Sequence, residues 1–213
     1  LVDEANSQLK ILTALFTVPY AGIIAFGYNF LTLWLKDANY MQSQYMQIYI
    51  LMILVLLDII TSTYMYSIHS IFIAIDKVRV YSIILFISSI ISICTTLFLL
   101  KFTGLGVYAI AGTSAVILGF THGIIVPGCA AKLLSKSIFT FCKTELKSWG
   151  SLAIVSGTFF IVKRFMFISN WGQFFINIVF VALFGYILEF FLVFNKNEKK
   201  ELVKIIKNKV FDK

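Results

Sequence analysis

The sequence predicts an all-α integral membrane protein built as a bundle of six transmembrane helices. Of its 213 residues, 60% are hydrophobic and 13% are charged, and the mean hydropathy is +0.92. Soluble domains carry about 25% charged residues. A bilayer core of about 30 Å is crossed by about 20 apolar residues in a helix. Six stretches meet that length and form one expected domain over 1–195: 11–35, 48–74, 80–100, 105–131, 148–168 and 173–194.

The first two stretches are long and differ in what interrupts them. The stretch 11–35 contains Pro19, which lacks a backbone donor and is expected to kink the helix near 20–22. The stretch 48–74 has no helix breaker, but it contains Asp58 and His69 in otherwise apolar or weakly polar surroundings. An ionisable residue within a span predicts a functional or buried position.

Small and weakly polar residues mark the third and fourth stretches. The third has a mild polar stripe, which predicts hydrogen bonds between helices: Ser88, Ser92 and Thr95. The fourth repeats small residues every four positions, which predicts close helix packing: Ala111, Ala115, Gly119 and Gly123. His122 lies on an adjacent face of that helix, where it is expected to be hydrogen-bonded within the bundle or to line a cavity.

The fifth and sixth stretches carry charges near their ends. Lys163 and Arg164 interrupt 148–168, so that it spans only if both side chains extend to the surface. In 173–194, Glu189 is either buried or close enough to the end to reach the surface. Beyond it, residues 196–213 have a basic amphipathic pattern, which is typical of a helix on an anionic membrane surface or of a solvated tail.

The basic residues predict the orientation. Of the 18 Lys and Arg residues, all but four fall in the termini and the connections on one side. Those on the opposite side are Lys36, Lys101, Lys163 and Arg164. Because cytoplasmic loops retain Lys and Arg, we expect both termini in the cytoplasm. The net charge of +8 then reflects membrane topology, and no nucleic-acid partner is expected. The chain starts at Leu1 and not Met, so we expect it to be part of a longer protein.

Enzyme and metal chemistry have little support in the sequence. The three cysteines, Cys94, Cys129 and Cys142, have neither pair spacing nor a histidine cluster, and a disulfide framework or zinc site is not expected. The patterns GxxxxGK[ST], HExxH, GxSxG and CxxC are absent from the sequence. We therefore expect no catalytic residues and no resident metal.

The polar residues of the second stretch share one helical face. Spacings of 4, 3, 4, 3 and 4 connect Asp58, Ser62, Met65, His69, Phe72 and Asp76, with Thr61 beside them. A charge facing lipid at the bilayer centre costs at least about 2.5–3.5 kcal/mol, so this face should point to the bundle interior or to a cavity. Asp58 and His69 are about 16 Å apart along the axis and cannot bond to each other.

Three segments resemble one known family. PYAGIIAFGYNFLTLWLKDANY resembles the seventh helix and outer loop of polysaccharide flippases, FIAIDKVRVYS their cytoplasmic turn between helices eight and nine, and KFTGLGVYAIAGTSAVILG their entry to helix ten. These flippases belong to the multidrug/oligosaccharidyl-lipid/polysaccharide exporter superfamily. The resemblance covers most of 8–195 and implies the second lobe of a two-lobed exporter in a bacterial cytoplasmic membrane, with an N-terminal lobe and membrane lipids as partners.

The resemblance implies translocation of a polyprenyl-pyrophosphate-linked oligosaccharide by alternating access. On this hypothesis the cavity path comprises Asp58, Thr61, Ser62, His69 and His122. Lys77 and Arg79 would attract the pyrophosphate at the inner mouth, while Lys163 and Arg164 would either anchor in headgroups or contact an anionic substrate at an outer vestibule. Asp58 is the candidate for a coupling cation or proton, and no other cofactor is expected.

Two alternatives remain open. A cation-coupled exporter of small organic cations would share the fold but match its substrate to acidic residues. A non-transporting membrane scaffold, or the product of a half-gene, would use the polar face of the second stretch only to pack against a partner helix.

Overall fold

The computed structural model describes residues 2–35, 42–194 and 198–199, and its regular elements are all helices. They are α1 (Val2–Trp34), α2 (Gln42–Ala74), α3 (Val78–Phe102), α4 (Val107–Phe120), the π-helix η1 (Thr121–Ile125), α5 (Val126–Leu133), α6 (Phe139–Lys163) and α7 (Trp171–Val193). The predicted fourth span is therefore one helical rod made of α4, η1 and α5. All six predicted apolar stretches are helical over most of their length.

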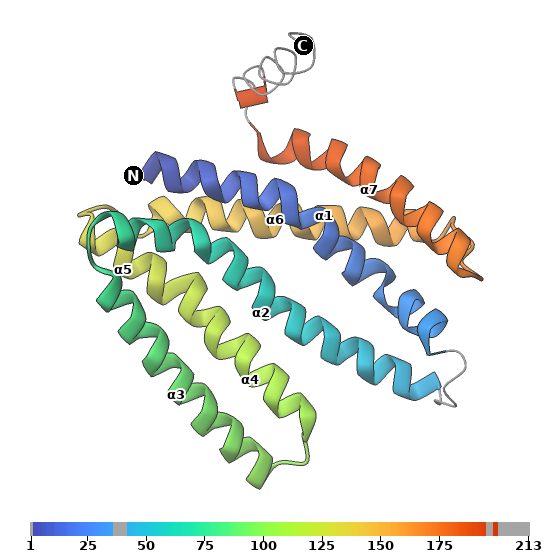
Figure 1. The fold of residues 1–213 in the computed structure, drawn as a ribbon, viewed down its shortest axis with the longest axis horizontal. Coiled ribbons are helices and arrows are strands. Elements are labelled where there is room, and N and C mark those ends of the chain that lie inside the picture. The colour runs from blue at the N-terminus through green and yellow to red at the C-terminus, as the bar shows by residue number, and fades with distance from the viewer. Residues whose placement is uncertain (1, 36–41, 195–197, 200–213) are drawn as a thin grey trace.

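The helices form two groups that meet along α1 and α2 (Figure 1). In the first group, α1 packs on both α6 and α7. In the second, α2 packs on α4, and α3 lies on the outer side of α4. One apolar core joins α1, α2, α6 and α7 around the fully buried Phe26, Ile60 and Phe159. A second core joins the other ends of α1 and α2 to α5 and α6, around Phe72 and Val126.

The distribution of polarity is that of a membrane protein. Five helical segments of the described chain are long and apolar enough to cross a membrane: α1, residues 44–74 of α2, α3, the rod Val107–Leu133, and α7. In α3 the buried residues are Ser88 and Ser92, whereas Phe86 and Phe98 are exposed. A helix that buries its polar residues and exposes its apolar ones is solvated by lipid, since lipid tails are as apolar as its side chains. The described chain therefore has the helices that a multi-pass membrane protein requires.

The helix bounds differ most from the sequence prediction in α1 and α6. α1 begins at Val2, nine residues before the predicted span, and Asp3 and Glu4 in its first turn are favourable at a helix N-terminus. α6 begins at Phe139 and ends at Lys163, so the predicted span 148–168 is wrong at its end. α6 is not among the five segments that are apolar enough to cross, because polar and basic residues fill its first turns.

Three chain ends and turns gather at one end of the bundle, on the left in Figure 1. They are the start of α1, the α2–α3 turn and the α5–α6 connection. Both turns use a left-handed residue to end a helix, Asp76 (φ 54°) and Ser135 (φ 52°). In each, the next backbone N–H donates back to the helix, from Lys77 to Phe72 O at 2.8 Å and from Lys136 to Ala131 O at 2.9 Å. This geometry holds the basic connections on a common side.

The consequence of Pro19 is visible in a contact between α1 and α7. Proline at this position cannot donate to the carbonyl of Leu15, four residues earlier. The Tyr186 hydroxyl of α7 donates to that carbonyl instead, at 3.3 Å. Figure 1 shows α1 changing direction beyond its midpoint. α7 therefore satisfies the backbone group that the predicted kink leaves free, as expected in a membrane, where water is not available to do so.

The basic tail, 196–213, lies outside the described residues except for Glu198 and Lys199. The Glu198 carboxylate accepts a bond from the Lys10 ammonium at 2.6 Å, in a salt bridge that joins the tail to α1.

Candidate functional site

A recess between α2 and α4 places Asp58 at its wall. The recess has a volume of about 350 Å³. Leu51, Val55 and Asp58 line it from α2, and α4 contributes Ala111 and Ser114. Asp58 is half-buried, and its Oδ1 atom is buried without a hydrogen-bond partner among the described residues. The carboxylate therefore has unused acceptor capacity beside a space that a ligand or ion can enter.

One turn further along α2, the polar face meets η1. The Ser62 hydroxyl lies 3.4 Å from Nδ1 of His122, which is 7% exposed. Asp58 lies one turn before Ser62 on the same face of α2. The Thr61 hydroxyl donates to the carbonyls of Leu57 and Asp58, at 3.1 and 2.9 Å. Asp58, Ser62 and His122 thus belong to one polar site, while the Thr61 hydroxyl proton is used within its own helix.

The position of His122 depends on a π-helical turn. Pro127 has no N–H to bond to the carbonyl four residues earlier, and its ring crowds that carbonyl. The helix widens just before it, and the Val126 N–H donates to Thr121 O, five residues back. Single π-helical turns inside α-helices often lie at functional sites. Here the turn directs the buried His122 side chain towards α2, and it lets Thr121 donate to Ser88 of α3 at 2.8 Å.

The small residues of the fourth stretch face α2 and then α6, as the packing prediction requires. A Cβ atom at Gly119 would lie 3.9 Å from Thr61 Cγ2, and one at Gly123 would lie 3.4 Å from Glu145 Oε1. The rod can approach two helices closely because these positions lack side chains. The hydrogen bond from Thr121 to Ser88 likewise confirms the interhelical role expected of the third stretch at that residue.

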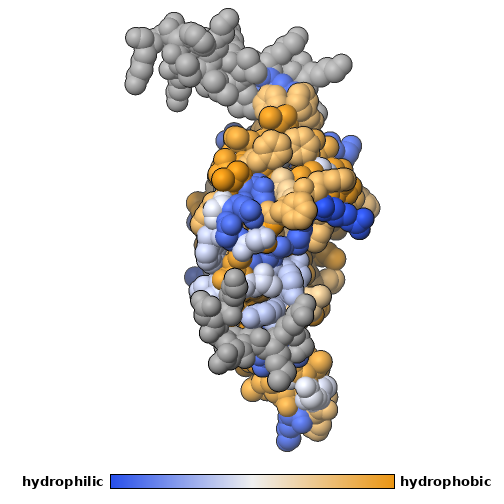
Figure 2. Space-filling view, turned by 90° about the vertical axis from the view of Figure 1, so that its right-hand side faces the viewer, coloured by the Kyte–Doolittle hydropathy of each residue, from blue (hydrophilic) through white to orange (hydrophobic). Residues whose placement is uncertain are grey.

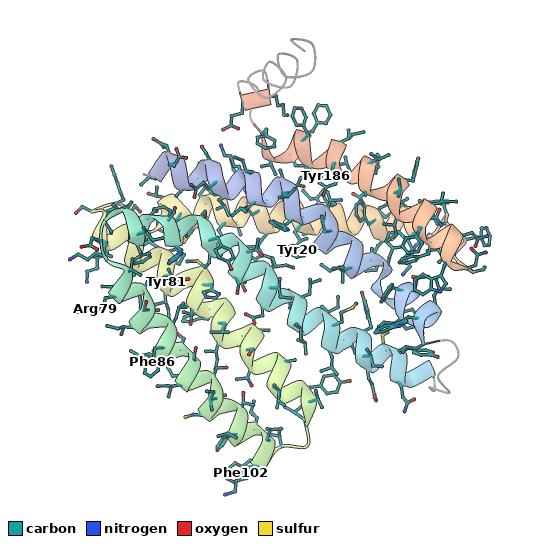
Figure 3. All side chains as sticks on the ribbon, in the orientation of Figure 1. Tyr20, Arg79, Tyr81, Phe86, Phe102 and Tyr186 are labelled. Atoms are coloured by element: carbon teal, nitrogen blue, oxygen red, sulfur yellow. The ribbon has the colours of Figure 1, made fainter. Side chains whose placement is uncertain are left out.

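The C-terminal part of the polar face of α2, around His69 and Phe72, has different neighbours. His69 packs on Tyr81 of α3 with their ring centroids 4.5 Å apart, and Phe72 packs on the same tyrosine. Figure 3 shows Tyr81 and Arg79 at the end of the bundle where α2 turns into α3. Lys77 and Arg79 are both exposed there. The structure therefore places His69 near these two basic residues and away from the Asp58 recess.

The two basic residues at the end of α6 have separate environments. The Lys163 ammonium donates to the Ala25 carbonyl of α1 at 2.7 Å, and it lies 5.9 Å from the ring centroids of both Phe26 and Phe160. Arg164 is exposed. Lys163 thus folds against α1. The end of the bundle with the α1–α2 and α6–α7 connections carries polar residues among apolar ones (Figure 2).

A buried polar cluster between α1, α6 and α7 was not identified as a site from the sequence. Glu189 is 0% exposed, which excludes the expectation that it extends to the surface. Its Oε1 atom accepts a bond from Ser151 at 3.0 Å, and Thr17 also bonds to the carboxylate. Nearby, the hydroxyls of Thr13 on α1 and Ser148 on α6 are hydrogen-bonded at 2.7 Å. Gln173, Asn177, Gly185 and Glu189 lie at multiples of four residues and share this face. The partners of Glu189 on α1 and α6 are more than 30 residues away in sequence, which is why the cluster was not predicted.

A second buried carboxylate, Glu145 of α6, also escaped the sequence analysis. It is 8% exposed, and its side chain bonds to Trp149 one turn along the same helix. Its Oε1 atom lies against Gly123, so the carboxylate borders η1 on the side of α6. The sequence around it, CKTELKSW, is rich in polar residues and is typical of an exposed helix end, which gave no signal of burial.

Comparison with known proteins gives no relative. No family model matches the chain, no curated protein is similar to it, and no solved structure is similar to its fold. The fold and the polar site between α2, α4 and η1 therefore carry the functional argument.

Proposed function

We propose that this chain is one lobe of a membrane transporter that moves a polyprenyl-pyrophosphate-linked oligosaccharide from the inner to the outer leaflet by alternating access. The family resemblance of three segments suggests the substrate. The exporter lobe itself is supported by a multi-pass helical bundle whose polar groups line a recess within the membrane-spanning region.

The observation that carries the proposal is the Asp58 recess. A buried carboxylate oxygen without a partner is costly in a membrane helix, and such residues commonly mark substrate or ion paths. Asp58 Oδ1 is such an atom, and it adjoins a space of about 350 Å³. His122 and Ser62 extend the polar wall towards the end of the bundle where Lys77 and Arg79 are exposed. Sugar hydroxyls would bond along this wall, and the two basic residues would attract the pyrophosphate.

A second function is favoured by the sign of the charge in the recess. Asp58 is its ionisable lining residue, and Leu51, Val55, Ile110 and Ala111 make most of the remaining wall apolar. An acidic group in an apolar recess suits a small organic cation. An exporter of organic cations would therefore use the same lobe and the same residue with a different substrate. The scaffold alternative is supported only by the packing of His69 and Phe72 of α2 on Tyr81 of α3.

The test is substitution of Asp58 and His69, separately, in the full-length protein. We expect Asp58→Asn to lower the surface glycan at an unchanged protein level, because the amide cannot bind a coupling ion or exchange a proton. His69→Gln should lower it if the polar path continues to the basic end. The matched control is Asp76→Asn, which removes an exposed carboxylate from the α2–α3 turn.

The outcomes separate the three functions. Normal surface glycan in both variants would refute the roles proposed for Asp58 and His69. Loss of organic-cation export in Asp58→Asn, with surface glycan unchanged, would establish the second function. A scaffold predicts that neither transport assay changes, whereas assembly with a partner chain does.

A further inference from the structure

Five polar side chains lie together where α1, α6 and α7 pack on one another, and none of them is more than 5% exposed. They are Thr13 and Thr17 of α1, Ser148 and Ser151 of α6, and Glu189 of α7. We call them the Glu189 cluster. Their oxygens form two layers about one helical turn apart, because residues three or four positions apart share a helix face. One layer is the hydrogen bond between Thr13 and Ser148, and the other joins Thr17 and Ser151 to Glu189.

The cluster has one acidic group and no basic partner. α7 contains no Lys or Arg between Trp171 and Val193. The basic residues of α1 and α6 either bond to other groups or are exposed: Lys10, Lys143, Lys147 and Lys163. Within the described chain, Glu189 therefore takes part in no ion pair. An unpaired carboxylate in an apolar interior is strongly destabilising, so the group must be neutralised from outside the chain.

The two carboxylate oxygens of Glu189 have different surroundings. Oε1 accepts a bond from the Ser151 hydroxyl at 3.0 Å, whereas Oε2 is buried and no described residue hydrogen-bonds it. A proton on either oxygen would neutralise the charge but leave Oε2 without a partner. A water molecule would bond to Oε2 but leave the charge. A bound cation provides both the partner and the neutralising charge.

The composition of the cluster selects the kind of cation. All five side chains offer oxygen, which is the ligand type that hard cations prefer. One carboxylate among neutral hydroxyls balances a single positive charge. Elsewhere in the described chain, too, no three His, Cys, Asp or Glu side chains gather to match a multivalent ion. The hydroxyls already lie 2.7–3.0 Å from their partners, so the site suits a small ion such as Na⁺ better than the larger K⁺.

The kink in α1 adds a backbone oxygen beside the cluster. Pro19 leaves the Leu15 carbonyl without its helical bond, and the Tyr186 hydroxyl donates to it at 3.3 Å. Leu15 is two residues before Thr17, and Tyr186 is about one turn before Glu189. Carbonyls freed at interruptions of membrane helices are common Na⁺ ligands in transporters. The second lone pair of this carbonyl remains available.

We infer that the Glu189 cluster binds a dehydrated Na⁺ ion between α1, α6 and α7. The Glu189 carboxylate and the hydroxyls of Thr17 and Ser151 hold the ion, and the pair formed by Thr13 and Ser148 supports them. The site goes beyond the proposed function, because it does not depend on the transported substrate or on the recess between α2 and α4. Its oxygens come from three helices far apart in sequence, so no spacing in the sequence indicates it.

The experiment measures the binding of radiolabelled Na⁺ to the purified full-length protein in detergent, with choline chloride keeping the ionic strength constant. We expect saturable binding that unlabelled NaCl displaces, and that KCl displaces at least about tenfold less effectively. Glu189→Gln keeps the size of the side chain but removes its charge, and Ser151→Ala removes one hydroxyl. Each should weaken Na⁺ binding at least about tenfold.

Matched variants separate loss of the site from a general disturbance. Ser89→Ala removes an exposed hydroxyl of α3 and should bind Na⁺ as the parent does. Thr17→Val should weaken binding, whereas Thr158→Val should not, because the Thr158 hydroxyl bonds only to its own helix on an exposed side of α6. Melting temperatures in choline chloride verify that each variant is folded. Na⁺ should raise the melting temperature of the parent but not that of Glu189→Gln, since only a folded site binds the ion.

Several results would overturn the inference. One is a parent protein without saturable Na⁺ binding, and another is unchanged binding in both Glu189→Gln and Ser151→Ala. Loss of binding in Asp58→Asn but not in Glu189→Gln would assign the ion to the recess between α2 and α4. A melting temperature that depends on pH through Glu189 but not on Na⁺ would show that the carboxylate holds a proton instead. Transport is not measured, so failure of the proposed function leaves the binding result unaffected.

Discussion

Asp58 and Glu189 are both carboxylates within apolar helices, and each has one buried oxygen that no described residue hydrogen-bonds. Their surroundings differ. Glu189 is fully enclosed between α1, α6 and α7 and accepts a bond from Ser151. Asp58 is half-buried at the wall of a recess between α2 and α4. The comparison teaches that an acidic residue in a span is an indication of burial first, and that only an adjoining space makes it a candidate for binding a substrate.

The largest expected difference between the two regions is in access from water. In a chain whose native cysteines are replaced by serine, Asp58→Cys should react with a water-soluble maleimide at least about tenfold faster than Glu189→Cys, because thiol reactivity requires a solvated thiolate. Labelling rates on the vesicle-embedded protein measure this. Equal rates at the two positions would remove the distinction between an open and a closed carboxylate.

The next effect concerns packing. A Cβ atom at Gly185 would lie 2.5 Å from Phe159, whose side chain is 1% exposed and cannot move aside. We expect Gly185→Ala to lower the free energy of unfolding by about 1–3 kcal/mol through overpacking. The matched change Gly119→Ala between α2 and α4 meets only an ordinary contact at 3.9 Å, and helix propensity should make it neutral or stabilising by up to about 1 kcal/mol. Thermal unfolding in detergent compares them, and similar melting temperatures would show that the two regions are equally tight.

A smaller effect is expected from the charge of Glu189. Glu189→Ala removes the acceptor of the Ser151 hydroxyl and should cost about 1–2 kcal/mol, the usual effect of leaving a buried donor unpaired. Glu189→Gln retains an acceptor oxygen and should be milder. The free energy of unfolding in detergent is the measurement. An equal loss in the two variants would indicate that the charge, which both remove, matters more than the acceptor oxygen.

The smallest effect should come from Tyr186→Phe. It removes the hydroxyl that donates to the Leu15 carbonyl, and hydrogen bonds between membrane helices contribute about 0.6 kcal/mol on average. The control is Tyr66→Phe, because Tyr66 is 68% exposed. Thermal unfolding of both proteins tests whether α7 satisfies the Pro19 kink. Identical melting temperatures would show that this carbonyl has another partner.

The sequence by itself determined the class of the protein and the positions of most helices. Hydropathy and length suffice for that, since a bilayer allows only fully hydrogen-bonded segments of a minimum length. The alignment of Asp58, Ser62 and His69 on one face also followed from spacing alone. The span predicted for α6 extends five residues too far, over 164–168, because hydropathy does not locate where α6 ends.

Only the tertiary structure decided which polar residues face one another. Ser62 and His122 are 60 residues apart and meet because Pro127 induces a π-helical turn, a change in helix phase that a regular period does not predict. Glu189 is enclosed because Ser151 and Thr17 come from two other helices. Spacing fixes the face on which a side chain lies, while its burial and its partners depend on how distant helices pack against that face.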